Sequence, residues 1–215
     1  MESHSQYVII AAMRSLLAAC SLLFLAACVA PPPTFFTPAA EQTLPPPPPD
    51  RAQIVFLHPG GGLMALLGHV YELNGEQRQY LGTVGAKTKL VHNVPPGKHL
   101  FMSNSVGYGH ILEADVDPGK RYFILMRYVH GRGQQMRPVR NAGGDPEFTV
   151  GNPQFRQWLA ESQVVNRTAD AEAWQAQYKS FNDDAYARGW KEWQEKRPDQ
   201  RAELTLNRED SVNLQ

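Results

Sequence analysis

Residues 94–129 read VPPGKHLFMSNSVGYGHILEADVDPGKRYFILMRYV, and this stretch decides the fold. It contains two similar turns, Pro96-Gly97-Lys98 and Pro118-Gly119-Lys120, and each turn precedes a new apolar run. Proline fixes φ at one position of a turn and glycine accepts positive φ at the next, so each turn reverses the chain. The repeat predicts strands over residues 98–105, 110–116 and 121–129, arranged in a small two-sheet sandwich.

Further strands are expected on the N-terminal side of this stretch. Apolar runs between turn residues predict strands over 52–58, 65–73, 77–82 and 87–93. Asn74-Gly75 lies between two of them and is a strong hairpin signal, because both residues tolerate positive φ. Residues 51–140 are therefore expected to form a mainly β domain, a small antiparallel β-sandwich of about seven strands.

A C-terminal α-helical extension is expected over residues 141–198. A stretch rich in Gly and Pro, 141–151, marks its boundary, and Pro153 can occupy the first turn of a helix near 153–162. Thr168 has the side chain of an N-cap and is expected to open a longer helix that ends before Pro198. Residues 199–215 are expected to form a polar, frayed tail.

The longer helix carries two aromatic stripes at helical spacing. One consists of Ala171, Trp174, Tyr178, Phe181 and Ala185, and the other of Tyr186, Trp190 and Trp193. One interpretation is that one stripe covers an open face of the sheet and the other forms its flank, since helix stripes usually belong to the core. The alternative is that Tyr186, Trp190 and Trp193 form a surface for an envelope protein, a glycan or lipid.

The N-terminus has the features of an export signal. Arg14 precedes the apolar run SLLAACSLLFLAA at 15–27, which is shorter than the roughly 20 residues that a membrane span needs. The run ends in Leu25-Ala26-Ala27-Cys28, which resembles the lipobox of bacterial lipoproteins. The resemblance implies that residues 1–27 are a signal peptide and that the Cys28 thiol receives a lipid.

Two alternatives concern this N-terminus. Leu17-Ala18-Ala19-Cys20 has the same pattern, but the apolar run between Arg14 and Cys20 is shorter than the roughly 7 to 15 residues of a signal peptide. Met13 is an alternative start to Met1, because residues 1–12 are unusual ahead of a signal. Cleavage before Cys28 would leave it as the only cysteine of the mature chain, so no disulfide is expected.

Residues 28–50 are expected to be a lipidated, proline-rich tether. They contain nine of the 17 prolines, which favours a stiff polyproline-II spacer of up to ~60 Å. The expected location is the cell envelope, with the lipid holding the protein on a membrane. Val29 is not aspartate, which by the sorting rule of enteric bacteria favours the outer membrane and a domain that faces the periplasm.

The net charge of the chain is zero, with 21 basic and 21 acidic residues, so no nucleic-acid partner is expected. The two halves differ, however. Residues 51–140 carry 11 Lys and Arg against 5 Asp and Glu, a net of +6, whereas residues 141–215 carry 9 against 13, a net of −4. The halves could attract each other, the basic half could face anionic lipid, or the difference could be ordinary surface charge.

Histidines are the main candidates for metal chemistry. Six lie between residues 58 and 130, and the weak candidates for metal ligands are His92, His99 and His110. No local ligand motif accompanies them, so no metal, cofactor or catalytic residue is predicted. The alternative is a periplasmic hydrolase, metal-assisted or acid/base-assisted, that acts on cell-wall material.

One further resemblance concerns the β region. AQIVFLH at 52–58, Val-x-Pro-Gly-x-His at 94–99 and x-Pro-Gly-x-x-Tyr-Phe-Ile at 117–124 are similar to a family of bacterial lipoproteins with a domain of unknown function. The family's fold is similar to transthyretin-like and PEGA-type sandwiches. The resemblance implies a binding or structural module of the cell envelope rather than an enzyme, and it brings no catalytic residues.

Overall fold

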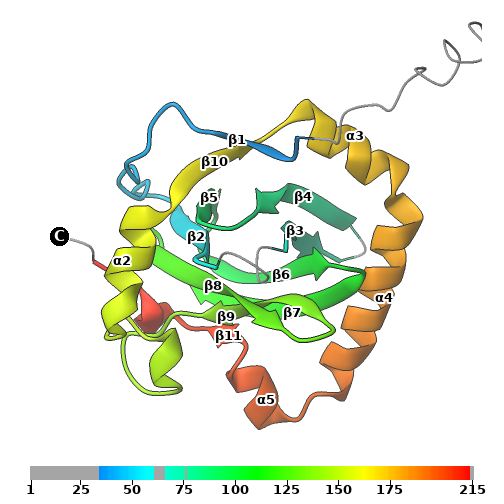
Figure 1. The fold of residues 1–215 in the computed structure, drawn as a ribbon. Helices are drawn as coiled ribbons and strands as arrows, with labels where there is room; N and C mark the ends of the chain where they lie inside the picture. The colour runs from blue at the N-terminus through cyan, green and yellow to red at the C-terminus, as the bar shows by residue number, and fades with distance from the viewer. Residues whose placement is uncertain (1–33, 61–65, 76, 214–215) are drawn as a thin grey trace, which may run out of the picture. The chain divides into compact units, whose positions relative to one another are not determined.

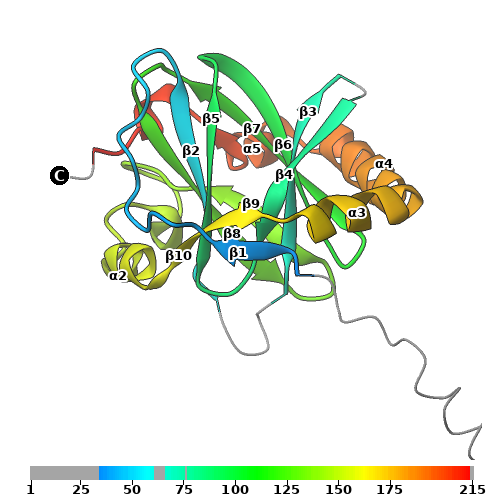
Figure 2. The ribbon, with the colours of Figure 1, turned by 90° about the horizontal axis from the view of Figure 1, so that it is seen from above.

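The computed structural model describes residues 34–60, 66–75 and 77–213, which form two packed sheets with helices outside them (Figures 1 and 2). The six-stranded sheet has the order β1 (Phe36–Pro38), β10 (Gln163–Arg167), β5 (Thr88–Val94), β2 (Ala52–His58), β8 (Arg121–Val129) and β9 (Gly133–Pro138). The five-stranded sheet has the order β11 (Thr205–Leu206), β7 (Tyr108–Val116), β6 (Gly97–Ser105), β3 (Gly68–Asn74) and β4 (Gln77–Val84).

The seven strands predicted from the sequence are confirmed as β2 to β8, with small shifts of their ends. Gly75, Gly97 and Gly119 all have positive φ, as their turns require. The two Pro-Gly turns do more than reverse the chain. The first carries it from β5 in the six-stranded sheet to β6 in the other, and the second carries it back from β7 to β8.

The prediction of a seven-stranded antiparallel sandwich is wrong in two respects. Four short or peripheral strands, β1, β9, β10 and β11, add to the two sheets, and both sheets are mixed. Parallel pairs join β2 to β8, β10 to β5 and β11 to β7. The crossing at Pro118-Gly119 accounts for the first of these pairs, because the strand that returns to the six-stranded sheet lies beside β2 in the same direction.

The main core lies between the two sheets. Alternate residues of β2, Ala52, Ile54 and Phe56, face this core and are fully buried, and Phe56 meets the Phe101 ring of β6 edge-on at 5.4 Å. The intervening residues Val55 and Leu57 are also buried, because they face a second core outside the sheet. β2 is therefore buried on both faces, which explains its continuous apolar run.

Helices cover the outer faces of both sheets (Figure 1). α2 (Pro153–Glu161) packs against the six-stranded sheet through Phe155, and α4 (Lys179–Glu195) packs against the five-stranded sheet through Trp193. Thr168 is the N-cap of a helix, as predicted, and its side chain accepts a hydrogen bond from the Ala171 N–H. The predicted single long helix is divided at Tyr178 into α3 (Ala169–Gln177) and α4.

The expectation of a free-standing spacer does not hold for residues 34–50, which lie on the domain. β1 pairs with β10, and the Ala39 N–H donates to the Val164 carbonyl at 2.8 Å. The proline run is held through its carbonyl oxygens, because Pro45 accepts hydrogen bonds from the Gln53 and Arg121 side chains. Proline lacks an N–H donor but keeps its carbonyl acceptor, and this acceptor is enough to attach the proline run to the domain.

The expected frayed tail is also part of the fold. Residues 198–210 form α5 (Pro198–Ala202), β11 and a final 3-10 turn, η3 (Arg208–Asp210). β11 is the edge strand beside β7, and Leu206 is fully buried in the core between the sheets. The segment is polar in composition, but three of its described apolar residues, Leu204, Leu206 and Val212, are buried in the domain.

The extension at 141–198 and the β region are joined by strand pairing and by charge. β10 lies inside the extension in sequence but inside the six-stranded sheet in space. Ion pairs connect the basic half to the acidic half, among them Arg140 with Asp210 at 2.8 Å and Arg132 with Glu192 at 2.9 Å. The charge difference between the halves thus appears as mutual attraction. None of the described helices is long and apolar enough to cross a membrane.

Candidate functional site

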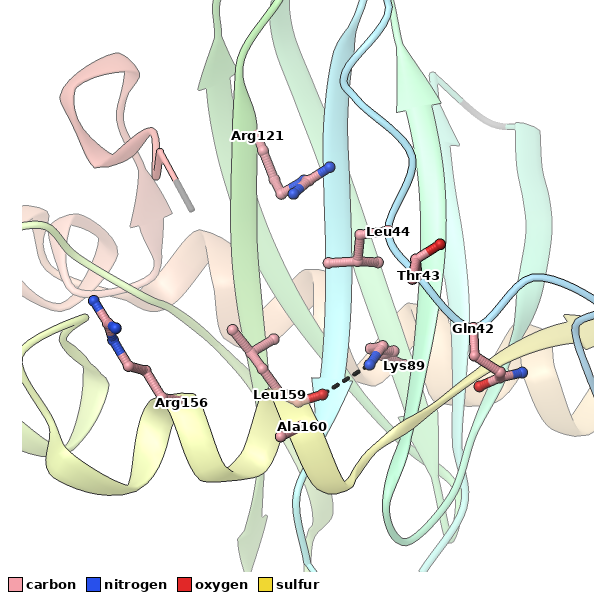
Figure 3. A pocket seen from close by; sticks show the side chains of 8 residues that line it. All are labelled: Gln42, Thr43, Leu44, Lys89, Arg121, Arg156, Leu159 and Ala160. Carbon is pink, nitrogen blue, oxygen red and sulfur yellow. Dashed lines mark hydrogen bonds between the residues drawn. The ribbon is translucent and has the colours of Figure 1, made fainter. Parts of the chain in front are cut away.

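A cleft of about 500 Å³ lies over the outer face of the six-stranded sheet, between α2 and the segment at residues 42–44 (Figure 3). From the sheet, Lys89 of β5 and Arg121 of β8 line it, and β2 lies between these two strands. Its lining consists of Gln42, Thr43, Leu44, Lys89, Arg121, Arg156, Leu159 and Ala160.

Lys89 lies at the base of the cleft and is buried, with 6% of its surface exposed. It belongs to β5, where Leu90 faces the core between the sheets and Lys89 faces the opposite side. Its ammonium donates to the carbonyl oxygens of Leu159 at 2.8 Å and Ser162 at 2.6 Å. The cation therefore holds the C-terminal end of α2, where carbonyl groups lack helical partners. Burial lowers the pKa of Lys89.

The guanidinium groups of Arg121 and Arg156 line the same cleft as Lys89. Arg121, the first residue of β8, donates from Nε to the Gln53 side chain at 2.6 Å and from its terminal nitrogen to the Pro45 carbonyl. Arg156 projects from the exposed side of α2. Within the part of the chain that the structure describes, the Arg156 guanidinium has no hydrogen bond and no ion pair, so all its donors remain available to a ligand.

The charge of the cleft is one-sided. Three cations line it, and none of the described residues of its lining is acidic. Such a concave surface attracts anions, and a guanidinium binds carboxylate or phosphate through paired N–H donors. The remaining polar side chains, Gln42 and Thr43, supply amide and hydroxyl groups. The arrangement suits recognition of an anionic group.

The structure brings together two of the three histidines considered as metal ligands. His92 on β5 and His99 on β6 both contact the Glu72 carboxylate on β3, at 3.2 Å through Nε2 and at 2.7 Å through Nδ1. The cluster bridges the two sheets at one end of the main core, next to Phe101, which stacks on the His99 ring. The two hydrogen bonds lower the pKa of Glu72 to about 2, and the same carboxylate raises the pKa of His99.

The geometry of this cluster differs from a metal site. Each imidazole bonds to a different oxygen of Glu72, and the second ring nitrogen of His99 bonds to the Pro95 carbonyl at 2.8 Å. His110 lies elsewhere, with its Nε2 against the Arg132 carbonyl at 3.0 Å. Among residues 34–60, 66–75 and 77–213, no three His, Cys, Asp or Glu residues are placed to hold one metal ion.

The candidate partner surface at Tyr186, Trp190 and Trp193 lies against the five-stranded sheet. Trp193 is buried beside Met102 and Ile111, and Arg201 lies over its ring at 5.5 Å. Tyr186 and Trp190 are partly buried at the edge of the same cluster. The stripe therefore covers the sheet, which was the first of the two interpretations, and Trp193 is not accessible to a partner.

No sequence pattern predicted the cationic cleft. One signal was present, because Lys89 is the one Lys, Arg, Asp or Glu residue in its strand. No pattern indicated that residues 42–44 would form a wall, since the proline-rich segment was interpreted as a spacer. Cys28 and the lipobox residues Leu25, Ala26 and Ala27 lie outside the described residues.

Comparison with known proteins adds no assignment. No protein-family model matches the chain, and no curated protein matches its sequence. The function is therefore argued from the residues and their arrangement.

Proposed function

We propose that the protein is a lipid-anchored module of the cell envelope that faces the periplasm and binds an anionic glycan in the cationic cleft, without catalysing a reaction. The lipobox at Leu25 to Cys28 supports the anchor. The similarity of the β region to envelope lipoproteins with a domain of unknown function supports the class of module.

One observation carries the proposed ligand chemistry. Lys89, Arg121 and Arg156 line a single cleft, and no described acidic side chain in its lining compensates them. Arg156 is the group most available to a ligand, because Lys89 and Arg121 are already engaged by carbonyl and amide oxygens. Carboxylate-bearing cell-wall glycan has the charge and the location that this cleft requires.

The alternative function, hydrolysis of cell-wall material, is less well supported. A hydrolase needs a general base or a metal-bound water that faces the substrate. The carboxylate with the most shifted pKa, Glu72, is mostly buried between the sheets and accepts hydrogen bonds from two imidazoles. The cluster is thus better described as a connection between the sheets.

The anchor is tested by feeding cells labelled palmitate. The wild-type chain is expected to carry the label and to remain in the membrane fraction, whereas the Cys28→Ser variant should lose both properties. An unlabelled wild-type chain with an intact N-terminus would overturn the anchor.

The ligand is tested by co-sedimentation of the full-length protein with purified peptidoglycan, in competition with inorganic phosphate. Arg156→Glu is expected to weaken binding about tenfold or more, since a hydrogen bond to a charged group contributes about 1.5–3 kcal/mol. Lys120→Glu, an equal change of charge at an exposed residue outside the cleft, is the control. Equal losses in the two variants, or no loss in either, would contradict a ligand in the cleft.

A further inference from the structure

The exposed apolar side chains of the domain are concentrated in two neighbouring segments. Among the described residues, the large apolar side chains classed as exposed are Val106, Tyr108, Tyr178 and Phe181. Two lie at the β6–β7 turn and two lie at the start of α4. The segments touch, because the Phe181 ring lies against Gly107, where an added Cβ would be 3.1 Å from it. We call these four residues the apolar tip.

Val106 is held in a backbone conformation that valine rarely adopts. Its φ is +49°, and its side chain is 57% exposed, so little packing compensates the strain. A turn position with positive φ would accommodate glycine or asparagine at lower energy. Strained, exposed positions of this kind are concentrated at sites of function.

Cations surround the apolar tip. Two guanidinium groups lie over the Tyr108 ring, those of Arg132 at 5.7 Å and Arg188 at 5.9 Å from its centroid. Arg132 also pairs with Glu192, but Arg188 bonds only to the Gly107 carbonyl and has no carboxylate partner among the described residues. Apolar side chains, a tyrosine and arginines together are typical of surfaces that lie at the headgroup level of a bilayer.

The start of the described chain is linked to this tip. Thr34 accepts a hydrogen bond from Thr168, at the start of α3, and Figure 2 shows β1 beside that helix. Phe35 packs on Trp174 with ring centroids 5.4 Å apart, and Trp174 stacks on Tyr178 at 4.8 Å. A continuous series of aromatic contacts thus runs from Phe35 to the apolar tip.

The distance from the lipid to the domain is short. Thr34 is held on the domain, so only the chain between it and Cys28 can separate the domain from the lipid. Even fully extended, this connection reaches only about 20 Å, well below the ~60 Å expected for a spacer over the whole proline-rich segment. A bilayer that holds the lipid on Cys28 is therefore within reach of the apolar tip.

We propose that the apolar tip, Val106, Tyr108, Tyr178 and Phe181 with the flanking Arg132 and Arg188, docks on the surface of the same bilayer that holds the protein's lipid. The proposal rests on the proposed lipid anchor. It gives the domain a defined orientation, in which the β6–β7 turn faces the headgroups and the opposite ends of these strands face away.

The test uses the full-length lipidated protein in vesicles of phosphatidylethanolamine and phosphatidylglycerol. Val106→Cys introduces one reactive thiol, because Cys28 is acylated, and it is labelled with an environment-sensitive dye. The matched control is Lys120→Cys, an exposed position at the other end of β7, about 30 Å away along nine residues of strand. The dye at 106 is expected to shift to the blue and to be quenched at least twofold by spin-labelled lipid, whereas the dye at 120 should show neither change.

Two results separate this proposal from the proposed function. Protein that floats with the vesicles while both dyes report water would overturn docking and leave the anchor intact. Protein that fails to float would overturn both. Arg188→Glu should reduce the quenching at position 106, and vesicles of phosphatidylcholine alone should reduce it as well, because the anionic headgroups are then absent. Quenching that is unchanged by both would overturn the role assigned to the arginines.

Discussion

Gly189 of α4 lies directly against Gly109 of β7, and the two backbones approach as closely as the absence of side chains permits. A methyl group on Gly189 would overlap the Gly109 carbonyl oxygen and would lie 3.0 Å from the Gly109 Cα. A methyl group on Gly109 would in turn overlap the Ala185 carbonyl oxygen. This contact sets the distance between the helix and the five-stranded sheet.

Gly189→Ala is expected to lower the free energy of unfolding by about 1–3 kcal/mol, because backbone rather than a flexible side chain must move. Helix propensity alone would predict the opposite sign, since alanine favours helix over glycine by about 1 kcal/mol. Urea denaturation followed by tryptophan fluorescence measures the difference. Gly151→Ala is the control, because an added Cβ there meets only the Thr149 hydroxyl at 3.6 Å. A stabilised Gly189→Ala variant would show that α4 is not packed on β7 as described.

Glu72→Gln is expected to lower the free energy of unfolding by roughly 2 kcal/mol near pH 6, because it removes a charged acceptor shared by His92 and His99. The pKa of Glu72 is lowered from 4.5 to about 2, so its contribution is present above about pH 4.5 and is lost as the pH falls toward 2. The pKa of His99 is raised above 6.5, so its contribution is present below 6.5 and is lost as the pH rises through the higher value.

The difference between wild type and Glu72→Gln should therefore be largest between about pH 4.5 and 6.5, and smaller on both sides. Urea denaturation across this range measures it. A difference that does not vary with pH would mean that the cluster is not charged in the folded protein.

His69→Phe is expected to make the protein more resistant to acid. Burial lowers the pKa of His69 from 6.5 to about 4, so the unfolded chain binds the proton first and stability is lost as the pH falls from 6.5 toward 4. By about pH 4 the loss reaches roughly 3 kcal/mol. Phenylalanine keeps a ring against Trp174, which stacks on His69 at 4.7 Å, and leaves Thr83 its bond to Tyr80.

The measurement for His69→Phe is the midpoint of acid unfolding followed by circular dichroism. The variant midpoint should lie at lower pH than that of wild type. An unchanged midpoint would indicate that other groups, such as the buried His58 and His110, control acid unfolding.

Trp193→Ala is expected to lower the free energy of unfolding by about 3–5 kcal/mol, because a buried indole is removed from the contact between α4 and the sheet. Tyr178→Ala is the control, since Tyr178 is 42% exposed. Thermal unfolding followed by circular dichroism compares them. Similar losses in the two variants would contradict the burial of Trp193.

The strands from 52 to 129 could be predicted because local turn chemistry and apolar runs determine them. The turns at Asn74-Gly75, Pro96-Gly97 and Pro118-Gly119 each contain a glycine with positive φ, and glycine is the residue type that adopts this conformation most readily. The pairing of β2 with β8 could not be predicted in the same way. It joins residues about seventy positions apart, and no local pattern states to which sheet the chain returns after Gly119.

The short strands were missed for a related reason. β1 contains a proline and has three residues, and β11 has only two. β10 reads QVVNR, with two adjacent apolar residues. None of the three has the alternation of apolar and polar residues by which a strand is recognised. Each forms because an open sheet edge is available to it. His92 and His99 were weak candidates for metal ligands, and the structure places both on the Glu72 carboxylate instead. That meeting depends on how the two sheets face each other, which no local pattern contains.

The edges of the two sheets have a consequence for when the domain can form. β1, near the start of the described chain, needs β10 as its partner, and the edge of β7 is covered by β11 at residues 205–206. A chain made from its N-terminus therefore cannot complete the six-stranded sheet before β10 at residues 163–167, nor the five-stranded sheet before β11 at residues 205–206.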